Sequence, residues 1–328
     1  MKWPSCLAFG VAFCIVGCSA PVLRTTLPSS MAAAPALIRV GVKDGNKITI
    51  QNVPLEKYVQ VSIISEFAPP SGEPEIVERM LEVQAVIGRT YTLAHLGRHK
   101  ADGFDVCSTT HCQLFQPSRL TTSRWAAQST DAVRRTAGMV LWFDGAPARA
   151  LFHADCGGHT SKADEVWEGE GRPYLVSNAD DGPAEKAHAT WRYAGRLAAV
   201  EAALNKDPRT RVGARLDGIQ VLERDAAGRA ERIAIHGTRD RIVRGEALRE
   251  VLTRSFGART IRSTWFDVRR DGAMLVFEGR GFGHGVGLCQ AGALARIRAG
   301  ETVASVLRRY FPGTGIVTMR THARIAGP

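Results

Sequence analysis

Three segments of this chain combine carboxyl, imidazole, amide and thiol side chains with glycine. They are 65–91, 152–161 and 279–290, which lie far apart in a sequence of 328 residues. The second reads Phe-His-Ala-Asp-Cys-Gly-Gly-His-Thr-Ser, and the third reads Gly-Arg-Gly-Phe-Gly-His-Gly-Val-Gly-Leu-Cys-Gln. Such side chains can exchange protons, donate hydrogen bonds or bind a metal ion. We therefore expect these segments to meet in one cleft.

Glu66 is the candidate catalytic residue of the first segment. It follows an apolar stretch rich in valine and isoleucine and precedes Phe67, Ala68 and Pro69. Apolar surroundings raise the pKa of a carboxyl group and keep it protonated, as a general acid must be. The alternative is an ordinary surface glutamate near the end of a helix.

The glycine-rich third segment predicts a turn where the backbone can approach a ligand closely. It lacks the Gly-Lys-Ser/Thr of a phosphate loop and the spacing of a dinucleotide fingerprint. His284 and Gln290 are candidates for lining a sugar cleft, and the alternative is a structural turn with His284 packed inside. Gly157 and Gly158 are expected to form the facing wall, with His153 beside them.

Arg89 and Tyr91 are further substrate-binding candidates, on the predicted helix over 74–95. The alternative is that Arg89 forms a buried ion pair and that Tyr91 is an aromatic side chain of the core. Gln113 is another candidate for the lining of the cleft.

Cys107, His111 and Cys112 form a short cluster with three interpretations. Zinc would use both thiols with one or two histidines, His99 and His111 being the candidates. The second interpretation is a Cys107–Cys112 disulfide, and the third is a pair of free thiols. The disulfide is our first expectation, because the spacing fits no standard zinc pattern. Cys156 and Cys289 lie in segments expected to meet and could form another pair.

Alternation and periodicity predict the elements that position these residues. A hairpin is expected over 38–50, and a helix from Pro74, a residue suited to the first helical position, to about His95. Further strands are expected within 139–153, with a turn at Asp144-Gly145, and at 218–224, 231–236, 265–270 and 274–278, followed by a short helix over 291–299. The fold class is therefore α+β: a single mixed domain over 38–320 with antiparallel strands, one long helix and a glycine-rich cleft, before a tail at 321–328.

Taken in order, these motifs resemble the stage II sporulation protein D family, also called the amidase-enhancer family. Its pattern runs approximately Glu-Met-Pro, Lys-Ala-Gln-Ala-Val-Ala-Ala-Arg-Thr-Tyr, Ser-Gly-Gly-Tyr-Thr, Gly-His-Gly-Val-Gly-Met-Ser-Gln and Tyr-Tyr-Pro-Gly-Thr. The likeness extends from about residue 38 to 320. It implies a lytic transglycosylase of peptidoglycan or an activator of wall amidases, with Glu66 at the position of the family's catalytic acid. Here Phe-Ala-Pro follows that glutamate, a departure from the family pattern.

The resemblance also implies that zinc is associated with the loop of Cys107, His111 and Cys112, although no cofactor is required for the chemistry. Ordinary glycosidases need two carboxylates. A lytic transglycosylase needs one, because the C6 hydroxyl of the sugar attacks C1 and a single glutamate can act as acid and then as base. The resemblance therefore implies glycan strands, stripped of their peptides, as the substrate.

Two other classes of function compete with this interpretation. A non-catalytic activator of a wall amidase would bind glycan in the same cleft without needing an ionisable group at Glu66. A cysteine hydrolase would use Cys289 with His284, or Cys112 with a histidine, although no acidic residue is evident to orient the base.

The formal net charge of +11 comes mainly from scattered arginines. No Lys/Arg run is dense enough for a nucleic-acid surface, so nucleic acid is not an expected partner. The alternatives are a solvated basic surface and attraction to an anionic polymer or membrane.

The N-terminus predicts export and a lipid anchor. Residues 1–17 resemble a lipoprotein signal peptide, whose apolar stretch is too short to span a bilayer, and Ile-Val-Gly-Cys resembles a lipobox with Cys18 as the lipidated residue. The alternative is an ordinary signal peptide cut after Ala20. Residues 18–37 are expected to tether the protein to the periplasmic face of a membrane, and Ser19 favours the outer membrane in a cell that has two.

Overall fold

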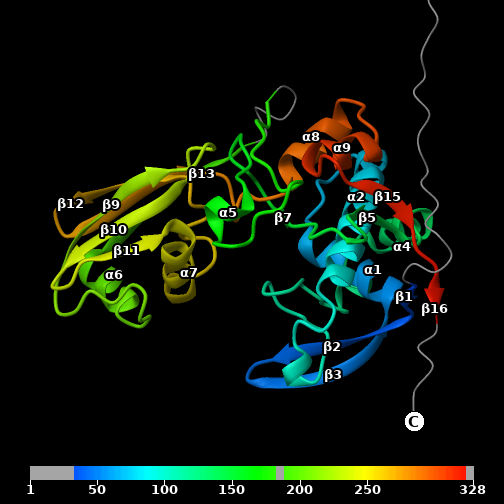
Figure 1. The fold of residues 1–328 in the computed structure, drawn as a ribbon, viewed down its shortest axis with the longest axis horizontal. Helices are drawn as coiled ribbons and strands as arrows, with labels where there is room; N and C mark the ends of the chain where they lie inside the picture. The colour runs from blue at the N-terminus through cyan, green and yellow to red at the C-terminus, as the bar shows by residue number, and fades with distance from the viewer. Residues whose placement is uncertain (1–32, 182–187, 323–328) are drawn as a thin grey trace, which may run out of the picture.

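The computed structural model describes residues 33–181 and 188–322. Cys18 and the predicted signal peptide lie outside these residues, so lipidation stays a prediction. Residues 33–37 were expected to belong to the tether, yet β1 (Ala34–Pro35) pairs in parallel with β16 (Thr321–His322), and β2 begins at Leu37. This pairing brings the two ends of the described chain together (Figure 1). None of the described helices is both long and apolar enough to cross a bilayer.

The buried apolar residues form two clusters, which we call the first core and the second core. The first core takes residues from Ala34 to Leu175 and from Val286 to Met319, and the second takes residues from Trp191 to Phe277. Figure 1 shows the elements of the second core on one side of β7 (Phe152–His153) and α5 (Ala163–Val166), and the helices of the first core on the other side. The chain therefore leaves the first core after residue 175 and returns to it at Val286.

The expected mixture of helices and antiparallel strands is confirmed, although the strands are divided among several small sheets. In the first core, the predicted hairpin is β2 (Leu37–Asp44) paired with β3 (Lys47–Pro54), and β4 (Val106–Cys107) pairs with β2 in parallel. The remaining elements of this part are α1 (Leu55–Glu66), α2 (Pro74–Ala94), a 3₁₀ turn (Lys100–Asp102), α3 (Arg119–Thr122), α4 (Ala126–Arg135), β5 (Met139–Phe143), β6 (Ala146–Pro147), β14 (Leu288–Cys289), α8 (Gln290–Arg298), α9 (Val303–Tyr310) and β15 (Gly315–Thr318).

The second core lies between two three-stranded antiparallel sheets and two helices. One sheet has the order β11-β10-β9 and the other β12-β13-β8. The bounds are β8 (Thr190–Arg196), α6 (Leu197–Leu204), β9 (Leu216–Arg224), β10 (Ala230–Gly237), β11 (Arg241–Arg244), α7 (Gly245–Phe256), β12 (Phe266–Asp271) and β13 (Met274–Arg280). The strands predicted from residue 218 onward are confirmed to within a few residues.

The strand pair predicted over 139–153 is confirmed only in its first half. Asp144 and Gly145 turn the chain with positive φ, and β5 pairs with β6 as an antiparallel hairpin. The second expected strand is divided, because Phe152 and His153 pair instead with β14 in parallel. That long-range pairing brings the motif segments 152–161 and 279–290 together.

Helix α2 is the central element of the first core. It begins with Pro74 at its first turn and ends at Ala94, as the periodicity predicted. The predicted apolar stripe is wider than expected, since every residue from Val83 to Thr92 is buried. The reason is that α1, α4, α8, α9 and β5 all pack against this one helix.

We predict that Ile87→Ala destabilises the chain by roughly 2–5 kcal/mol, because a large apolar side chain is lost from a filled interior. Ile87 is 0% exposed in the first core. Urea unfolding followed by circular dichroism measures the effect. Arg79→Ala, at an exposed position of the same helix, is the control and should change stability by no more than about 0.5 kcal/mol. Equal effects of the two substitutions would contradict a buried α2.

Candidate active site and metal clusters

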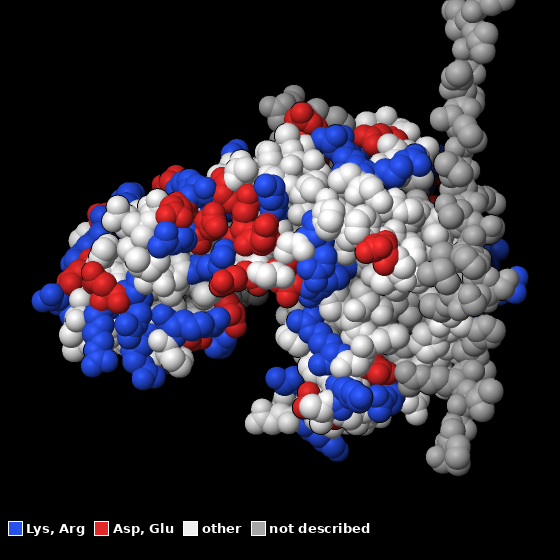
Figure 2. Space-filling view, viewed as in Figure 1, with Lys and Arg blue, Asp and Glu red and all other residues white. Residues whose placement is uncertain are grey.

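A cavity of about 600 Å³ lies between the two cores, with Glu66 in its wall. The space-filling view is hollowed between the part that holds α7 and the part that holds β2 and β3 (Figure 2). The first core contributes the end of α1, the loop at 110–112 and the segment at 151–154, and α7 of the second core contributes Glu246, Arg249, Glu250 and Thr253. Aromatic side chains in the lining are Tyr91, Phe152, Trp167 and Phe282.

Glu66 is the last residue of α1, and the apolar stretch that precedes it in the sequence is that helix. Its pKa is raised, first by burial, while a hydrogen bond from the backbone N–H of Leu114 to its Oε1 partly opposes the shift. The carboxyl end of a helix also disfavours a negative charge. The carboxyl group therefore keeps its proton to a higher pH than a solvated glutamate does.

Two neutral histidines face each other across the cavity lining. The rings of His153 and His284 are 5.3 Å apart, and burial lowers both pKa values, that of His284 to about 4. Val286 N–H donates to Nδ1 of His284 over 3.0 Å, which leaves the ring proton on Nε2. Nδ1 of His153 lies 3.1 Å from the carbonyl of Val286, which places its proton there, and its buried Nε2 has no partner among the described residues. The pair thus offers one donor and one acceptor, a combination that suits sugar hydroxyl groups.

Tyr91 lies in the cavity wall, while three other predicted binding residues lie behind it. Burial raises the pKa of Tyr91 to about 12, so its hydroxyl is neutral, and Arg98 Nη1 donates to it over 3.1 Å. Arg89 is 1% exposed and holds Glu56 through two hydrogen bonds, which is the buried ion pair of the alternative interpretation.

Gln113 and Gln290 are also buried and bonded within the protein. The hydroxyl of Thr92 donates to Gln113, and Gln290 donates to Gln84 of α2 over 3.4 Å. Neither glutamine is among the residues that line the cavity.

Gly157 and Gly158 do not line the cavity, but both have positive φ, of 78° and 110°. A Cβ on Gly157 would lie 3.0 Å from Trp265 and 3.1 Å from Arg280. The glycine at position 157 therefore lets this turn lie close against Trp265 and Arg280.

The sequence interpretation missed the contribution of α7. Glu246 is held by Arg249, whose guanidinium hydrogen-bonds both carboxylate oxygens and helps to lower the pKa of Glu246 against the effect of burial. No helix over 245–256 was predicted from the sequence, and nothing local showed that this segment faces Glu66. Trp167 lies outside the three motif segments, and only the structure places its ring 5.0 Å from that of His284.

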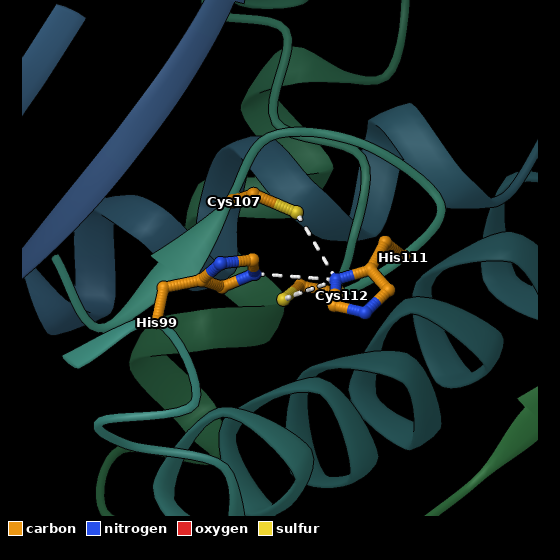
Figure 3. A group of neighbouring side chains, drawn as sticks. All are labelled: His99, Cys107, His111 and Cys112. Carbon is orange, nitrogen blue, oxygen red and sulfur yellow. Dashed lines mark hydrogen bonds between the residues drawn. The ribbon is translucent and has the colours of Figure 1, made fainter. Parts of the chain in front are cut away.

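His99, Cys107, His111 and Cys112 form a candidate metal site at the edge of the cavity. Their donor atoms lie within 4.8 Å of one another (Figure 3). Nδ1 of His111 is 3.8 Å from each sulfur and 3.2 Å from Nε2 of His99. The two sulfurs are not bonded to each other. Two thiols and two imidazoles are the donor set that zinc prefers.

The surroundings of this cluster also fit a metal ion. Asp102 accepts a hydrogen bond from Nδ1 of His99 over 2.9 Å, an arrangement that directs Nε2 toward a metal. A bound zinc would fix the loop at 107–112, and the next residues of that loop hold Glu66 through the N–H of Leu114. The ion would thus act as a structural support for the acid.

The comparisons with known proteins agree with this geometry. Residues 43–143 match the family described as stage II sporulation protein, and residues 183–287, around the second core, match a domain of unknown function. Stage II sporulation protein D of Bacillus subtilis (strain 168) is 26% identical over 299 residues, covering 88% of this chain and 80% of that protein. The chain is therefore similar to the stage II sporulation protein D and amidase-enhancer family over most of its length.

A second relative carries the other name of the family. The amidase enhancer of Bacillus subtilis (strain 168) is 25% identical over 278 residues, which cover 73% of this chain and 38% of the enhancer. Stage II sporulation protein D of Bacillus amyloliquefaciens is 25% identical and covers 89% of this chain. Both alignments are longer than the matched family segment at 43–143 and therefore take in later motifs as well.

We predict that Glu66→Gln changes stability in a pH-dependent way. Because folding raises the pKa of Glu66, its contribution to stability is full below the pKa of an unfolded glutamate and is lost as the pH rises through the folded pKa. Glutamine carries no charge, so the variant should gain stability relative to the parent chain as the pH rises across that window. Urea unfolding at a series of pH values measures this difference, and a difference that is constant or falls with pH would contradict a desolvated carboxyl group.

We predict that the chain binds zinc through this first cluster and that the Cys107→Ser/Cys112→Ser double substitution removes about one zinc per chain. The variant should also unfold at a lower temperature, since binding to the folded state alone stabilises it. Elemental analysis and thermal melting with and without a chelator test this. Cys107 and Cys112 found joined in a disulfide on peptide mapping would contradict it.

Proposed function

We propose that this protein cleaves the glycan strands of peptidoglycan as a lytic transglycosylase, with Glu66 as both acid and base. The observation that carries the proposal is a half-buried carboxyl group with a raised pKa in the wall of a large cavity. Aromatic, neutral polar and charged side chains share that wall, and aromatic walls with a few polar groups are usual in preformed ligand clefts. The similarity to stage II sporulation protein D and to an amidase enhancer supports a cell-wall substrate.

The proposed chemistry needs no second carboxylate. Protonated Glu66 gives its proton to the glycosidic oxygen, the bond from that oxygen to C1 breaks, and positive charge develops at C1. The carboxylate then removes the proton from the C6 hydroxyl of the same sugar while that oxygen bonds to C1. The products are a shortened strand and a 1,6-anhydro sugar end, and Glu66 is protonated again.

The raised pKa of Glu66 has a direct consequence for this step. A carboxyl group that is mostly ionised at working pH would have no proton to give, so burial provides the acid form. Neither His153 nor His284 competes with the glycosidic oxygen for the proton of Glu66, because burial has lowered both pKa values.

A second candidate function is the activation of a cell-wall amidase without catalysis. The observation that favours it is the relative whose printed name is amidase enhancer. Such a protein would bind glycan in the same cavity and would tolerate a neutral residue at position 66. Under either function we propose a cell-envelope location, a membrane association through the predicted lipid anchor at Cys18, and peptidoglycan and a wall amidase as partners.

A cysteine hydrolase that uses Cys289 has less support. Cys289 is 0% exposed and lies outside the cavity lining, so a substrate cannot reach its sulfur. Cys112 does line the cavity beside His111, but it belongs to the candidate metal cluster.

We predict that Glu66→Gln lowers the rate of anhydro-muropeptide release by about 100- to 10,000-fold, because the variant can neither give nor take a proton. The measurement is mass analysis of products from purified sacculi, with and without prior treatment by an amidase. The activity of the parent chain should fall as the pH rises through the raised pKa of Glu66.

Glu75→Gln, an exposed glutamate at the start of α2, is the matched control and should keep full activity. Stimulation of a wall amidase by the same two variants separates the candidate functions. Anhydro products from Glu66→Gln at the parental rate would overturn catalysis by this residue, and amidase stimulation retained without strand cleavage would show that both roles coexist.

A further inference from the structure

A second cluster of metal-binding side chains lies outside the cavity, where the chain passes between the two cores. Asp155, Cys156, His188 and Cys289 place their donor atoms within 4.8 Å of one another. Cys156 follows β7, Cys289 belongs to β14, and His188 precedes β8 of the second core. We propose that these four residues form a closed site for a thiophilic divalent cation, with zinc as the first candidate.

Backbone N–H groups point at both sulfurs, and the Cys156 thiol also donates to Oδ2 of Asp180 over 3.4 Å. Cys289 Sγ lies 3.2 Å from the backbone nitrogen of Cys156 and 3.2 Å from that of Gly292, both of which donate to it. Gly158 N–H donates to Cys156 Sγ over 3.3 Å. Backbone N–H groups aimed at a sulfur stabilise its negative charge, and the thiolate is the form that binds metal.

The imidazole of His188 is oriented by a backbone carbonyl. Nε2 of His188 lies 3.4 Å from the carbonyl oxygen of Asp180, so the ring proton on Nε2 points there and Nδ1 is left as the ligand atom. A carbonyl that holds the far nitrogen of a metal-binding histidine is a usual support for such a ligand. Nδ1 lies 2.6 Å from Oδ1 of Asp155 and 3.9 Å from Cys156 Sγ, separations that small side-chain rotations suit to ligands of one ion.

Asp155 can offer an oxygen to the ion from a fixed position. Its carboxylate is fixed by the N–H groups of Gly157 and Ala189, at 2.8 and 2.9 Å. Each carboxylate oxygen has two lone pairs, so these bonds do not exhaust them. Two sulfurs, one nitrogen and one oxygen then complete a tetrahedral set of four protein ligands, which is the form of a structural zinc site.

Burial makes a cation at this place favourable. Cys156 and Cys289 are 0% exposed, and the side chain of His188 is 6% exposed. Within the described residues Asp155 forms no ion pair with a lysine or arginine, and the buried guanidinium of Arg229 bonds the backbone carbonyl of Cys156 at 2.6 Å, not a sulfur or the carboxylate. Buried carboxylate and thiolate groups cost free energy unless a positive charge is close. A divalent cation would supply that charge at the centre of the cluster.

The four residues could instead form a disulfide or a catalytic triad, and the geometry favours neither. A disulfide between Cys156 and Cys289 would leave the oriented Nδ1 of His188 without a ligand role. A nucleophilic Cys156 would need access to substrate, which its complete burial prevents. A metal ion uses all four donors at once.

The position of the site gives the ion a structural task. Cys156 and Cys289 belong to the first core, whereas His188 lies three residues before Trp191 of the second core. The same region is joined by backbone hydrogen bonds between Asp155 and Phe282 and from Gly281 to Ala189. A bound ion would therefore hold the second core, and with it α7, in place relative to Glu66.

The test isolates this site by removing the first cluster. The full chain carrying Cys107→Ser and Cys112→Ser should retain about one zinc per chain. Adding Cys156→Ser and Cys289→Ser, which preserve side-chain size, should remove it. Cobalt(II) in place of zinc should give a thiolate charge-transfer band in the first variant and none in the second.

Two single substitutions, each made in the chain that already carries Cys107→Ser and Cys112→Ser, separate a loss of metal binding from a loss of folding. His188→Ala keeps both thiols but should weaken zinc retention during dialysis against a chelator by about tenfold or more. His236→Ala, a partly exposed histidine of the second core, is the control and should leave retention unchanged, while circular dichroism reports the fold of each variant. A first-cluster variant that is folded and binds neither zinc nor cobalt would overturn the proposal, as would a Cys156–Cys289 disulfide found by peptide mapping under non-reducing conditions.

Discussion

Helix α2 is buried along most of its length, yet it carries a series of polar side chains, and each of these needs a hydrogen-bond partner inside the protein. A buried polar group without a partner costs roughly 1–3 kcal/mol. The partners come from different parts of the chain: Gln84 meets Gln290 of α8, Arg89 meets Glu56 of α1, and the hydroxyl of Thr90 accepts from Leu141 of β5. The hydrogen bonds that satisfy the polar side chains of α2 therefore fix several segments that surround the cavity.

Thr92, also on α2, connects the same helix to the loop beside the acid. It donates to Gln113, and the next residue, Leu114, donates its N–H to Glu66. The polar residues that resemble family motifs on α2 thus act mainly by positioning their neighbours. Their pattern in the sequence reflects a packing requirement as much as a chemical one.

The cavity depends on the two cores keeping a fixed relation to each other. Glu66 and the two histidines belong to the first core, whereas Glu246 and Arg249 come from α7 of the second. Two clusters of metal-binding side chains lie near its borders and differ in their exposure. His111 of the first cluster is exposed beside the cavity, while the thiols of the second are wholly buried at the crossing between the cores. The first can support the loop that holds Glu66, and the second can support the arrangement of the cores.

The sequence by itself determined the features that are local in origin. The helix from Pro74 to Ala94, the hairpin of β2 and β3 and the place of Glu66 at the end of an apolar segment follow from periodicity and turn residues. The family followed from the order of the motifs. Only the tertiary structure decided that Arg89, Gln113 and Gln290 are bonded inside the protein, that α7 faces Glu66, and that His188 joins Cys156 and Cys289. These outcomes depend on contacts between residues far apart in the chain, and no local pattern specifies which distant group will satisfy a given side chain.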